Sequence, residues 1–436
     1  MTSSIKNQKG ILEKLSIEKL NDMQLEARSA IHSNADVVLL SPTGTGKTLA
    51  YLLPIVSELD RECTEVQVLI VVPSRELAIQ IEQVTREMGT GFKANAVYGG
   101  RASSKDKAEL KHRPAILIGT PGRIADHLRN DTFPTHKISR LVLDEFDKSL
   151  EVGFEVEMKE IVEALPSVKK RLLTSATFEV QVPAFVGLEN PKIVDYLKGE
   201  PTQLTVKTIV SPTKNKLETL VKLISHIGNH QGIIFCNFKD TIQEVSDYLS
   251  ENNISHGCFF GGMEQKDRER ALIKFRNGTH TIIIATDLAS RGLDIPEIKF
   301  IIHYQLPNRS HEFIHRNGRT ARMFSDGTAY VIKYEKENLP YFIENSTIEK
   351  LKNAPVPPAS KWTTLFISGG RQDKISKSDI AGLFFKQGLL GKEELGTIEI
   401  KLDCAFVSVD VSKAGNLIQT LDNTKLKNKK VRITEI

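Results

Sequence analysis

Short runs of consecutive apolar residues alternate with longer, more polar stretches over most of the chain. The first series of runs lies at 36–41 (DVVLLS), 66–73 (VQVLIVVP), 115–120 (AILIGT), 140–145 (RLVLDE) and 171–177 (RLLTSAT). Each run is rich in Val, Ile and Leu and is followed by a polar segment that is compatible with a helix. Continuous apolar strands separated by helices are typical of a parallel sheet that is covered on both faces.

The alternation of apolar and polar stretches then restarts. The second series of apolar runs lies at 232–237, 256–262, 281–287, 299–307 and 328–334. We therefore predict two α/β units of similar size. The joint between them is expected near 198–215, where Pro, Thr and charged residues replace the periodic pattern.

A second joint is marked by three prolines in NAPVPPAS at 353–360, because proline cannot continue a helix or a central strand. We expect α/β domains over 1–200 and 205–345, a proline-rich linker over 346–360 and a small α+β domain over 361–436.

Length and composition agree with a multidomain soluble protein. A chain of 436 residues is too long for one hydrophobic core. No apolar run approaches the roughly 20 residues that span a bilayer, and the N-terminal segment lacks the apolar stretch of a secretory signal. The four cysteines are scattered without metal-type spacing. We therefore expect a cytoplasmic protein with no membrane partner and no zinc site.

Positive charge is concentrated near the C-terminus. The net charge of the chain is +5, and residues 361–436 carry 13 Lys and Arg against 9 Asp and Glu, which is +4. A basic terminal domain suggests a polyanionic partner, although on charge alone a solvated surface is the simpler explanation.

The most informative chemical motif is LLSPTGTGKTLAYLLPI at 39–55, which combines an apolar strand, a glycine-containing turn and a helix. Glycines let backbone N–H groups surround phosphate oxygens, and the helix N-terminus adds positive potential. Lys47 can reach the β- and γ-phosphates, and the Thr48 hydroxyl can bind Mg²⁺. The predicted nucleotide-binding residues are Thr43, Gly44, Thr45, Gly46, Lys47 and Thr48.

Two adjacent carboxylates, Asp144 and Glu145, end the apolar run at 141–143. Taken alone, such a pair is most simply a solvated strand end. A phosphate-loop enzyme, however, needs one acid for the metal and another to orient the attacking water. We therefore predict that Asp144 holds Mg²⁺, that Glu145 positions or polarises the water, and that both act with Lys47 in catalysis.

The segment HRNGRTARMF at 315–324 places Arg319 and Arg322 on one side of a turn or short helix. One interpretation is a basic helix that faces RNA or solvent. The other is that the second unit supplies guanidinium groups to the γ-phosphate, where negative charge spreads over phosphoryl oxygens. We adopt the second hypothesis, in which hydrolysis depends on closure of the two units.

Nine motifs carry a family resemblance: SPTGTGKT, PSRELA, GG, TPGR, DEFD, SAT, IIFCN, ATDLASRGLDI and HRNGRTAR. In order and spacing the chain resembles the DEAD-box RNA helicases of superfamily two over roughly residues 10–340. The resemblance implies an RNA-stimulated ATPase and RNA helicase with two tandem RecA-like P-loop domains and with ATP and Mg²⁺ as cofactors. Phe146 replaces the alanine of the family motif, and this position can serve for packing alone.

The resemblance also implies further site residues. Gln24 hydrogen-bonds to the adenine base, and Asp294 contacts the nucleotide from the second domain. Ser175 and Thr177 couple the nucleotide state to domain closure. The implied RNA-binding residues are Arg75, Gly100, Thr120 and Arg123 in the first domain and Gln265, Arg268 and Thr286 in the second. Contacts to phosphates and 2′-hydroxyls would give RNA binding without sequence preference.

The C-terminal segment follows the order β-α-β-β-α-β. Strands are predicted near 364–368, 396–401, 404–410 and 430–434, and helices near 377–387 and 412–421. This order predicts an RRM-like sheet domain. The segment resembles the RNA-binding domain of DbpA-type helicases, which implies structured ribosomal RNA as the target.

Few aromatic residues occupy the expected stacking positions of this RRM-like sheet. Phe406 stands at one such position, whereas Cys404 and Val409 replace the other aromatics, so we expect little base stacking. Trp362 is expected to pack in the core or to dock the linker. RNA binding is instead expected from Lys425, Lys427, Lys429, Lys430 and Arg432, together with Arg371 and Lys374, although such a cluster is also compatible with a solvated edge.

The combined interpretation is an ATP-dependent RNA helicase that locally unwinds or remodels structured RNA. We expect ribosomal RNA during ribosome assembly as its substrate, and a monomer that associates with ribosomal precursors. One alternative is an ATP-locked RNA clamp without productive hydrolysis, against which Glu145, Arg319 and Arg322 argue. Another is a DNA translocase of the same superfamily, against which the TPGR and HRNGRTAR motifs argue.

Overall fold

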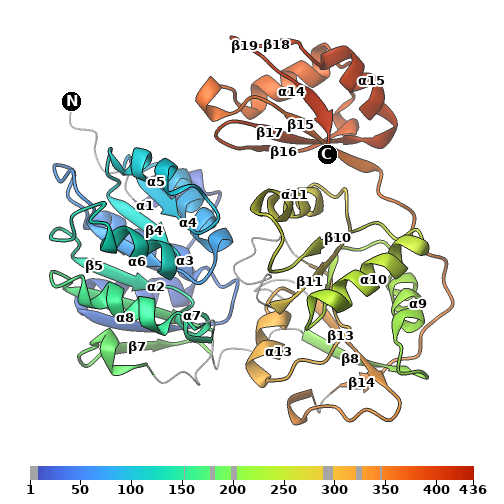
Figure 1. Ribbon diagram of the computed structural model, residues 1–436, viewed down its shortest axis with the longest axis horizontal. Helices are drawn as coiled ribbons and strands as arrows, with labels where there is room; N and C mark the ends of the chain where they lie inside the picture. Colours follow the sequence, from blue (N-terminus) through green and yellow to red (C-terminus); the bar gives the residue numbers. More distant parts are fainter. Residues whose placement is uncertain are drawn as a thin grey trace. The chain divides into compact units, whose positions relative to one another are not determined.

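The computed structural model describes residues 8–151, 153–176, 182–197, 204–287, 298–320, 327–343 and 346–436. The chain divides into two compact units, one formed by the residues before 203 and the other by the later described residues (Figure 1). No helix in these ranges is long and apolar enough to cross a membrane.

The first unit is built on a parallel seven-stranded sheet. In spatial order the strands are β3 (Ala94–Val97), β4 (Ile116–Gly119), β2 (Val68–Val71), β5 (Arg140–Leu143), β6 (Lys170–Ser175), β1 (Asp36–Leu40) and β7 (Lys192–Asp195). The helices of this unit are α1 (Gln8–Lys14), α2 (Asp22–Ser33), α3 (Lys47–Ser57), α4 (Arg75–Glu87), α5 (Ser103–Leu110), α6 (Pro121–Arg129), α7 (Phe146–Glu151) and α8 (Glu155–Glu163), with a 3₁₀ turn at Ala184–Val186.

Helices cover both faces of this sheet, as Figure 1 shows. Alternate residues of β2 enter two different cores: Val68 and Ile70 pack with α2, α3 and α4, whereas Leu69 and Val71 pack with α6 and α8. This double burial explains why the strands are apolar at nearly every position. It also explains why the sequence pattern identified five of them.

The second unit begins with another parallel seven-stranded sheet. Its order is β10 (His256–Phe259), β11 (Ile282–Ala285), β9 (Gly232–Phe235), β12 (Phe300–His303), β13 (Gly327–Tyr334), β8 (Leu204–Ser211) and β14 (Thr347–Ile348). The accompanying helices are α9 (Leu217–Ile227), α10 (Lys239–Glu251), α11 (Gln265–Arg276) and α13 (Ser310–Asn317), with a 3₁₀ turn at Tyr341–Ile343.

A smaller antiparallel sheet completes the second unit. Its order is β16 (Leu395–Ile400), β17 (Ala405–Asp410), β15 (Trp362–Ile367) and β20 (Ile433–Glu435), beside a two-stranded hairpin of β18 (Lys425–Leu426) and β19 (Lys429–Lys430). Helices α14 (Lys377–Lys386) and α15 (Val411–Leu421) bury one face of this sheet, and short 3₁₀ turns lie at Arg371–Asp373 and Lys392–Glu394. The predicted α/β class with two tandem RecA-like P-loop domains and a small RRM-like α+β domain is confirmed.

Two local predictions differ from the structure in detail. The two units divide at residue 203, within the joint predicted near 198–215, but this stretch also contains β8, an eight-residue strand that pairs in parallel with β13. Polar residues, among them the buried Thr208 and Ser211, interrupt the continuous apolar signal that a central strand usually has. The predicted strand at 430–434 is also displaced: Lys429–Lys430 pairs within the hairpin, and the sheet strand begins only at Ile433.

Candidate nucleotide and RNA sites

The carboxyl ends of three neighbouring strands bring the predicted nucleotide-binding residues together. Strands β5, β6 and β1 are adjacent in the first sheet. The phosphate loop follows β1, the pair Asp144–Glu145 follows β5, and Ser175 ends β6. The backbone N–H of Ser41 donates to the Ser175 carbonyl at 3.1 Å. Three segments that are far apart in sequence therefore meet at one edge of the sheet.

The phosphate loop has the backbone geometry that its glycines permit. Gly44 and Gly46 have φ angles of 83° and 87°, in the left-handed region. The Lys47 Nζ donates to the carbonyl oxygens of Ser41 at 2.5 Å and Pro42 at 2.8 Å. Burial lowers the pKa of Lys47 to about 8, although the nearby Glu145 and Asp144 charges oppose this shift. A bound phosphate could accept the same hydrogen bonds in place of the two carbonyls.

Gln24 lies directly beside the phosphate loop. Its Oε1 accepts from the Asn21 backbone N–H at 3.1 Å, which closes a capping box at the start of α2. Its Nε2 donates to the Gly46 carbonyl at 3.2 Å, and Asn21 Nδ2 donates to the Thr45 carbonyl at 3.1 Å. A Cβ at Gly46 would collide with the Gln24 amide. Gln24, which is predicted to bind adenine, is thus hydrogen-bonded to the phosphate loop.

Asp144 is a buried acid that hydroxyl donors hold in place. It is 3% exposed. Tyr51 donates its hydroxyl to Oδ2 at 2.9 Å, and Thr174 donates its hydroxyl to Oδ1. Burial raises the pKa of Asp144 and the charge of Glu145 adds to this effect, whereas Thr174, Lys47 and Tyr51 counteract it. A cation at this carboxylate would relieve the cost of its burial.

Glu145 has a special backbone conformation. Its φ of 49° lies in the left-handed region, which is uncommon for a residue other than glycine. The backbone N–H of Glu145 donates to Thr174 Oγ1 at 3.0 Å, and its Oε2 lies 2.9 Å from the Nζ of the buried Lys148. The next residue, Phe146, is 2% exposed and belongs to the apolar core. Phe146 therefore anchors the turn by packing, as the sequence allowed.

Mg²⁺ fits the donor set at this edge. The Asp144 carboxylate is buried beside the helix that begins with Lys47 and Thr48, and hydroxyl and carboxylate oxygens are the ligands that Mg²⁺ prefers. Among the described residues no cluster of three His, Cys, Asp or Glu side chains forms a metal site. Phosphate oxygens and water would have to complete the coordination, as is usual for Mg²⁺ bound with a nucleotide.

The four RNA-binding residues predicted in the first domain also lie close together. Arg75 begins α4, and a Cβ at Gly100 would collide with its guanidinium group. Thr120 is the N-cap of α6 and its backbone N–H donates to the Val97 carbonyl at 3.2 Å. Arg123 is in the first turn of the same helix. Arg75, Thr120 and Arg123 lie around the loop at 98–101, which carries Gly99 and Gly100.

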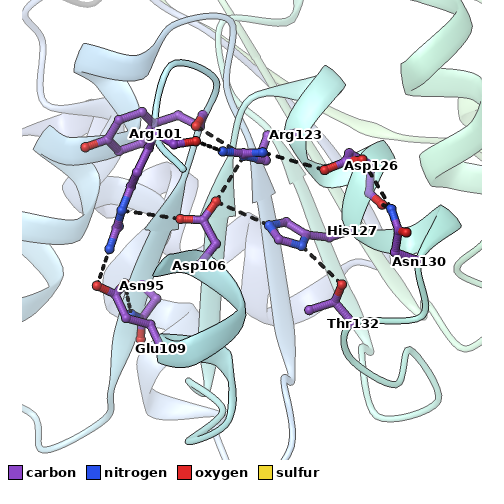
Figure 2. A network of polar contacts seen from close by, with 10 residues as sticks. Asn95, Arg101, Asp106, Glu109, Arg123, Asp126, His127, Asn130 and Thr132 are labelled. Atoms are coloured by element: carbon purple, nitrogen blue, oxygen red, sulfur yellow. Dashed lines mark hydrogen bonds and ion pairs between the residues drawn. The ribbon is translucent and has the colours of Figure 1, made fainter. Parts of the chain in front are cut away.

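Arg123 is hydrogen-bonded to this loop, as Figure 2 shows. Its Nε donates to the Tyr98 carbonyl at 3.3 Å, and its Nη2 donates to the Arg101 carbonyl. The same Nε lies 3.0 Å from Oδ2 of Asp106 in α5, whose side chain is fully buried. Arg123 thus connects α6 to the loop, in addition to any contact with RNA that its motif predicts.

Asp106 is the centre of this polar network (Figure 2). Its carboxylate lies 3.4 Å from Arg101 Nε and 3.4 Å from Nε2 of the buried His127. His127 Nδ1 contacts the Thr132 hydroxyl at 3.2 Å. The nearby Asp126 is 3.6 Å from Arg123 Nη1 but is 44% exposed. A buried carboxylate therefore neutralises two guanidinium groups that border the predicted RNA path.

The second sheet positions the remaining predicted RNA residues. Gln265 begins α11, the Arg268 guanidinium lies over the Phe259 ring at 4.8 Å, and Thr286 follows β11. Arg319 is 5% exposed, just after α13. The predictions for Thr177, Asp294 and Arg322 fall outside the described residues.

The neighbour of the predicted arginines, Arg316, is fully buried and connects three segments. Its Nε donates to Asp287 at 2.6 Å, its Nη2 to Asn237 at 2.8 Å, and its Nη1 to the Gln305 carbonyl at 2.9 Å. Nearby, burial lowers the pKa of His303 to about 3, so this imidazole stays neutral. Arg316 therefore holds together the three segments that contain Asp287, Asn237 and Gln305.

The basic residues of the small domain lie on its hairpin edge. Lys425, Lys430 and Arg432 are exposed, and so is Lys427, which has a φ of 52°. Lys427 Nζ lies 2.8 Å from Asp379, and Lys429 Nζ lies 2.8 Å from Asp373. Acidic neighbours thus offset part of the positive charge.

Sequence reasoning missed several residues that support these sites. Tyr51 lies four positions after Lys47, so helical spacing places both on one face of α3 and could have revealed it. Lys148 lies three positions after Glu145 and could have been found in the same way. Thr174 gave no local signal, because its partner Asp144 is 30 positions away. Asp106 lies five positions from Arg101 but 17 and 21 positions from Arg123 and His127, so the sequence did not reveal the network.

Three family models match the chain. The DEAD/DEAH box helicase model matches residues 21–185, the helicase conserved C-terminal domain matches 215–324, and the DbpA RNA binding domain matches 364–435.

Relatives with these domains match over long stretches. ATP-dependent RNA helicase DbpA of Bacillus subtilis is 28% identical, with 97% of this chain and 96% of that protein covered. DEAD-box ATP-dependent RNA helicase CshB of the same organism is 36% identical, with 74% of this chain and 75% of that protein covered. The solved structure of S. cerevisiae Dbp5 bound to RNA and ADP BeF3 matches with a TM-score of 0.67 and 25% identity, covering 75% of this chain and 87% of that one.

The fold built on the two parallel sheets agrees with this match to a solved helicase structure. The chain belongs to the DEAD-box ATP-dependent RNA helicases, which hydrolyse ATP and act on RNA, and it ends in a DbpA-type RNA-binding domain.

Proposed function

We propose that this helicase uses ATP and Mg²⁺ to unwind or remodel structured RNA locally, with ribosomal RNA during ribosome assembly as its substrate. It would act as a cytoplasmic monomer that associates with ribosomal precursors. The observation that carries the enzymatic part is the meeting of Lys47, Asp144 and Glu145 at one edge of the first sheet. The ribosomal part is supported by the C-terminal domain and its basic edge.

The chain's own residues have distinct tasks in ATP turnover. The backbone of residues 43–46 and the Lys47 ammonium bind the phosphates, and Gln24 binds the adenine. Thr48 and Asp144 would hold Mg²⁺, which would neutralise phosphate charge when bound. Glu145 would orient the attacking water and accept its proton.

The remaining nucleotide-binding and coupling residues are assigned by their motifs. Arg319 and Arg322 would stabilise the negative charge that develops on the γ-phosphate, and Asp294 would contact the nucleotide. Ser175 and Thr177 would couple the nucleotide state to domain closure.

RNA would be bound through its backbone in both helicase domains. Arg75, Gly100, Thr120 and Arg123 form the proposed path in the first domain, and Gln265, Arg268 and Thr286 form it in the second. In the C-terminal domain, Lys427, Lys429 and Lys430 would bind phosphates of a structured target. This last contact should depend steeply on salt, because each neutralised phosphate releases counterions.

An RNA clamp that binds ATP without productive hydrolysis is the alternative. The buried Asp144 and the fixed conformation of Glu145 favour the enzyme, because a clamp has no need to orient water. Phosphate release measured with and without RNA separates the two: the enzyme releases phosphate faster with RNA, whereas a clamp does not.

The RNA target is tested by crosslinking the full chain to cellular RNA and mapping the bound sites. A variant that lacks residues 361–436 serves as the matched control. Enrichment of ribosomal RNA sites by the full chain alone is expected. Equal enrichment by both proteins, or sites spread over all cellular RNA, would contradict the proposed target.

A further inference from the structure

The two faces of the C-terminal sheet have different partners. Leu365, Ile367 and Val407 point to the core formed with α14 and α15. On the opposite face the register places Thr364 beside Ser408. A sheet with helices on one side normally leaves the other side to water. Thr364 and Ser408, however, are only 0% and 1% exposed.

The end of α11 and the turn after it supply the hydrogen-bond partners of these buried hydroxyls. The Thr364 and Thr279 hydroxyl oxygens lie 2.7 Å apart, and Asn277 Nδ2 lies 3.5 Å from Thr364 Oγ1. Ser408 donates its hydroxyl to the Asn277 carbonyl at 2.9 Å. Buried polar groups are costly unless they are hydrogen-bonded, and here the partner is another domain of the same chain.

An ion pair lies beside the same contact. Arg276 donates from Nε to Glu399 Oε2 at 3.1 Å and from Nη2 to Oε1 at 2.9 Å, which is a two-pronged arrangement. Burial alone would raise the pKa of Glu399, but Arg276 and Lys401 outweigh it and the pKa is lowered. Glu399 pairs with Phe406 across β16 and β17, so the ion pair lies beside the expected stacking position.

The linker end is attached at this place as well. Ser360 donates its hydroxyl to the Gly278 carbonyl at 2.5 Å and accepts from the Trp362 backbone N–H at 3.0 Å. A Cβ at Gly278 would lie 3.4 Å from Trp362 Cδ1, so the indole ring lies against this glycine. Trp362 is the only tryptophan of the chain.

We propose that the outer face of the C-terminal sheet is a docking surface for the second helicase domain, which it binds through residues 276–279. This docking makes the two domains move together and closes the face on which RRM-like domains commonly stack bases. The docking follows from contacts within the chain alone. Its consequence, that RNA meets the domain at its basic hairpin edge, rests on the proposed function.

Trp362 fluorescence tests the docking directly in the full chain. Arg276→Glu and Glu399→Arg each bring like charges together, and each is expected to shift the emission to longer wavelength and increase quenching by acrylamide. Combining the two exchanges restores opposite charges, so both signals should return toward those of the unmodified protein. Lys266→Glu makes the same charge change at an exposed position of α11 and should leave the emission unchanged.

Two results would overturn the docking: unchanged emission in both single variants, or a double variant no closer to the unmodified protein than either single one. RNA binding by Phe366→Ala, which truncates a half-buried ring on the outer face, tests the closed face separately. Unchanged affinity is expected, and a large loss with unchanged Trp362 emission would show that this face binds RNA. Lys430→Glu tests the hairpin edge. Normal RNA binding by this variant would count against the proposed RNA site and not against the docking.

Discussion

Replacing Asp106 by Asn tests whether the buried network beside the proposed RNA path determines RNA affinity. The carboxylate of Asp106 is fully buried and lies 3.0 Å from Arg123 Nε and 3.4 Å from Arg101 Nε. Removing one partner of a buried ion pair costs about 3–5 kcal/mol. Both arginines keep other partners, namely the Tyr98 carbonyl and Glu109, so about 2 kcal/mol is a better expectation here.

This cost should appear as weaker RNA binding, because Arg123 holds the loop that carries Gly99 and Gly100. A loss of about 2 kcal/mol corresponds to roughly 30-fold in the dissociation constant. The assay is ATP turnover at increasing RNA concentration. We expect a higher RNA concentration for half-maximal stimulation, with the maximal rate and the ATP dependence nearly unchanged.

Asp126→Asn is the matched control, since it removes the same charge from the same guanidinium group at an exposed position 3.6 Å from Arg123. Exposed pairs contribute about 0–1 kcal/mol, so its RNA dependence should change by less than about fivefold. Equal effects of the two variants, or tighter RNA binding by Asp106→Asn, would refute the reasoning.

Three further predictions concern the nucleotide site and the C-terminal domain. Lys47→Ala should abolish binding of a fluorescent ATP analogue, and retained tight binding would contradict the phosphate-loop assignment. Because the lowered pKa of Lys47 is about 8, its charge is present below that pH, and ATP affinity should weaken as the pH rises above it. Tyr51→Phe removes a donor that lowers the pKa of Asp144, so the loss of ATPase activity on acidification should begin at higher pH; an identical pH profile would exclude this role. Removal of residues 361–436 should spare ATP hydrolysis with generic RNA but abolish selection of a structured target, and equal selectivity would exclude the domain from target choice.

Residues that are close in sequence or regular in spacing were predictable, whereas long-range partners were not. The phosphate loop and Asp144–Glu145 follow apolar strands, so their place at the carboxyl edge of a parallel sheet follows from the pattern. Tyr51 reaches Asp144 across 93 positions, which only the strand order can reveal. Strand β8 was not predicted because polar residues, including the buried Thr208 and Ser211, interrupt its apolar run.

In the small C-terminal domain, too, long-range contacts could not be predicted from the sequence. Its order of strands and helices was predictable, and the scarcity of stacking aromatics was visible in Phe406, Cys404 and Val409. The burial of Thr364 and Ser408 was not predictable, because it depends on the turn after α11 in another domain. Serine or threonine on the outer face of a sheet gives the same alternation of apolar and polar residues whether water or another domain covers that face.

The measurement that tests the central claim most directly is phosphate release by Glu145→Gln compared with the unmodified chain, at saturating ATP and RNA. Binding of ATP is measured in parallel. We predict that the variant binds ATP normally and that its turnover falls by orders of magnitude, because the proposed role of Glu145 is to act on the attacking water and not to bind the nucleotide. Unchanged turnover would show that the acid at the end of β5 is not the catalytic group.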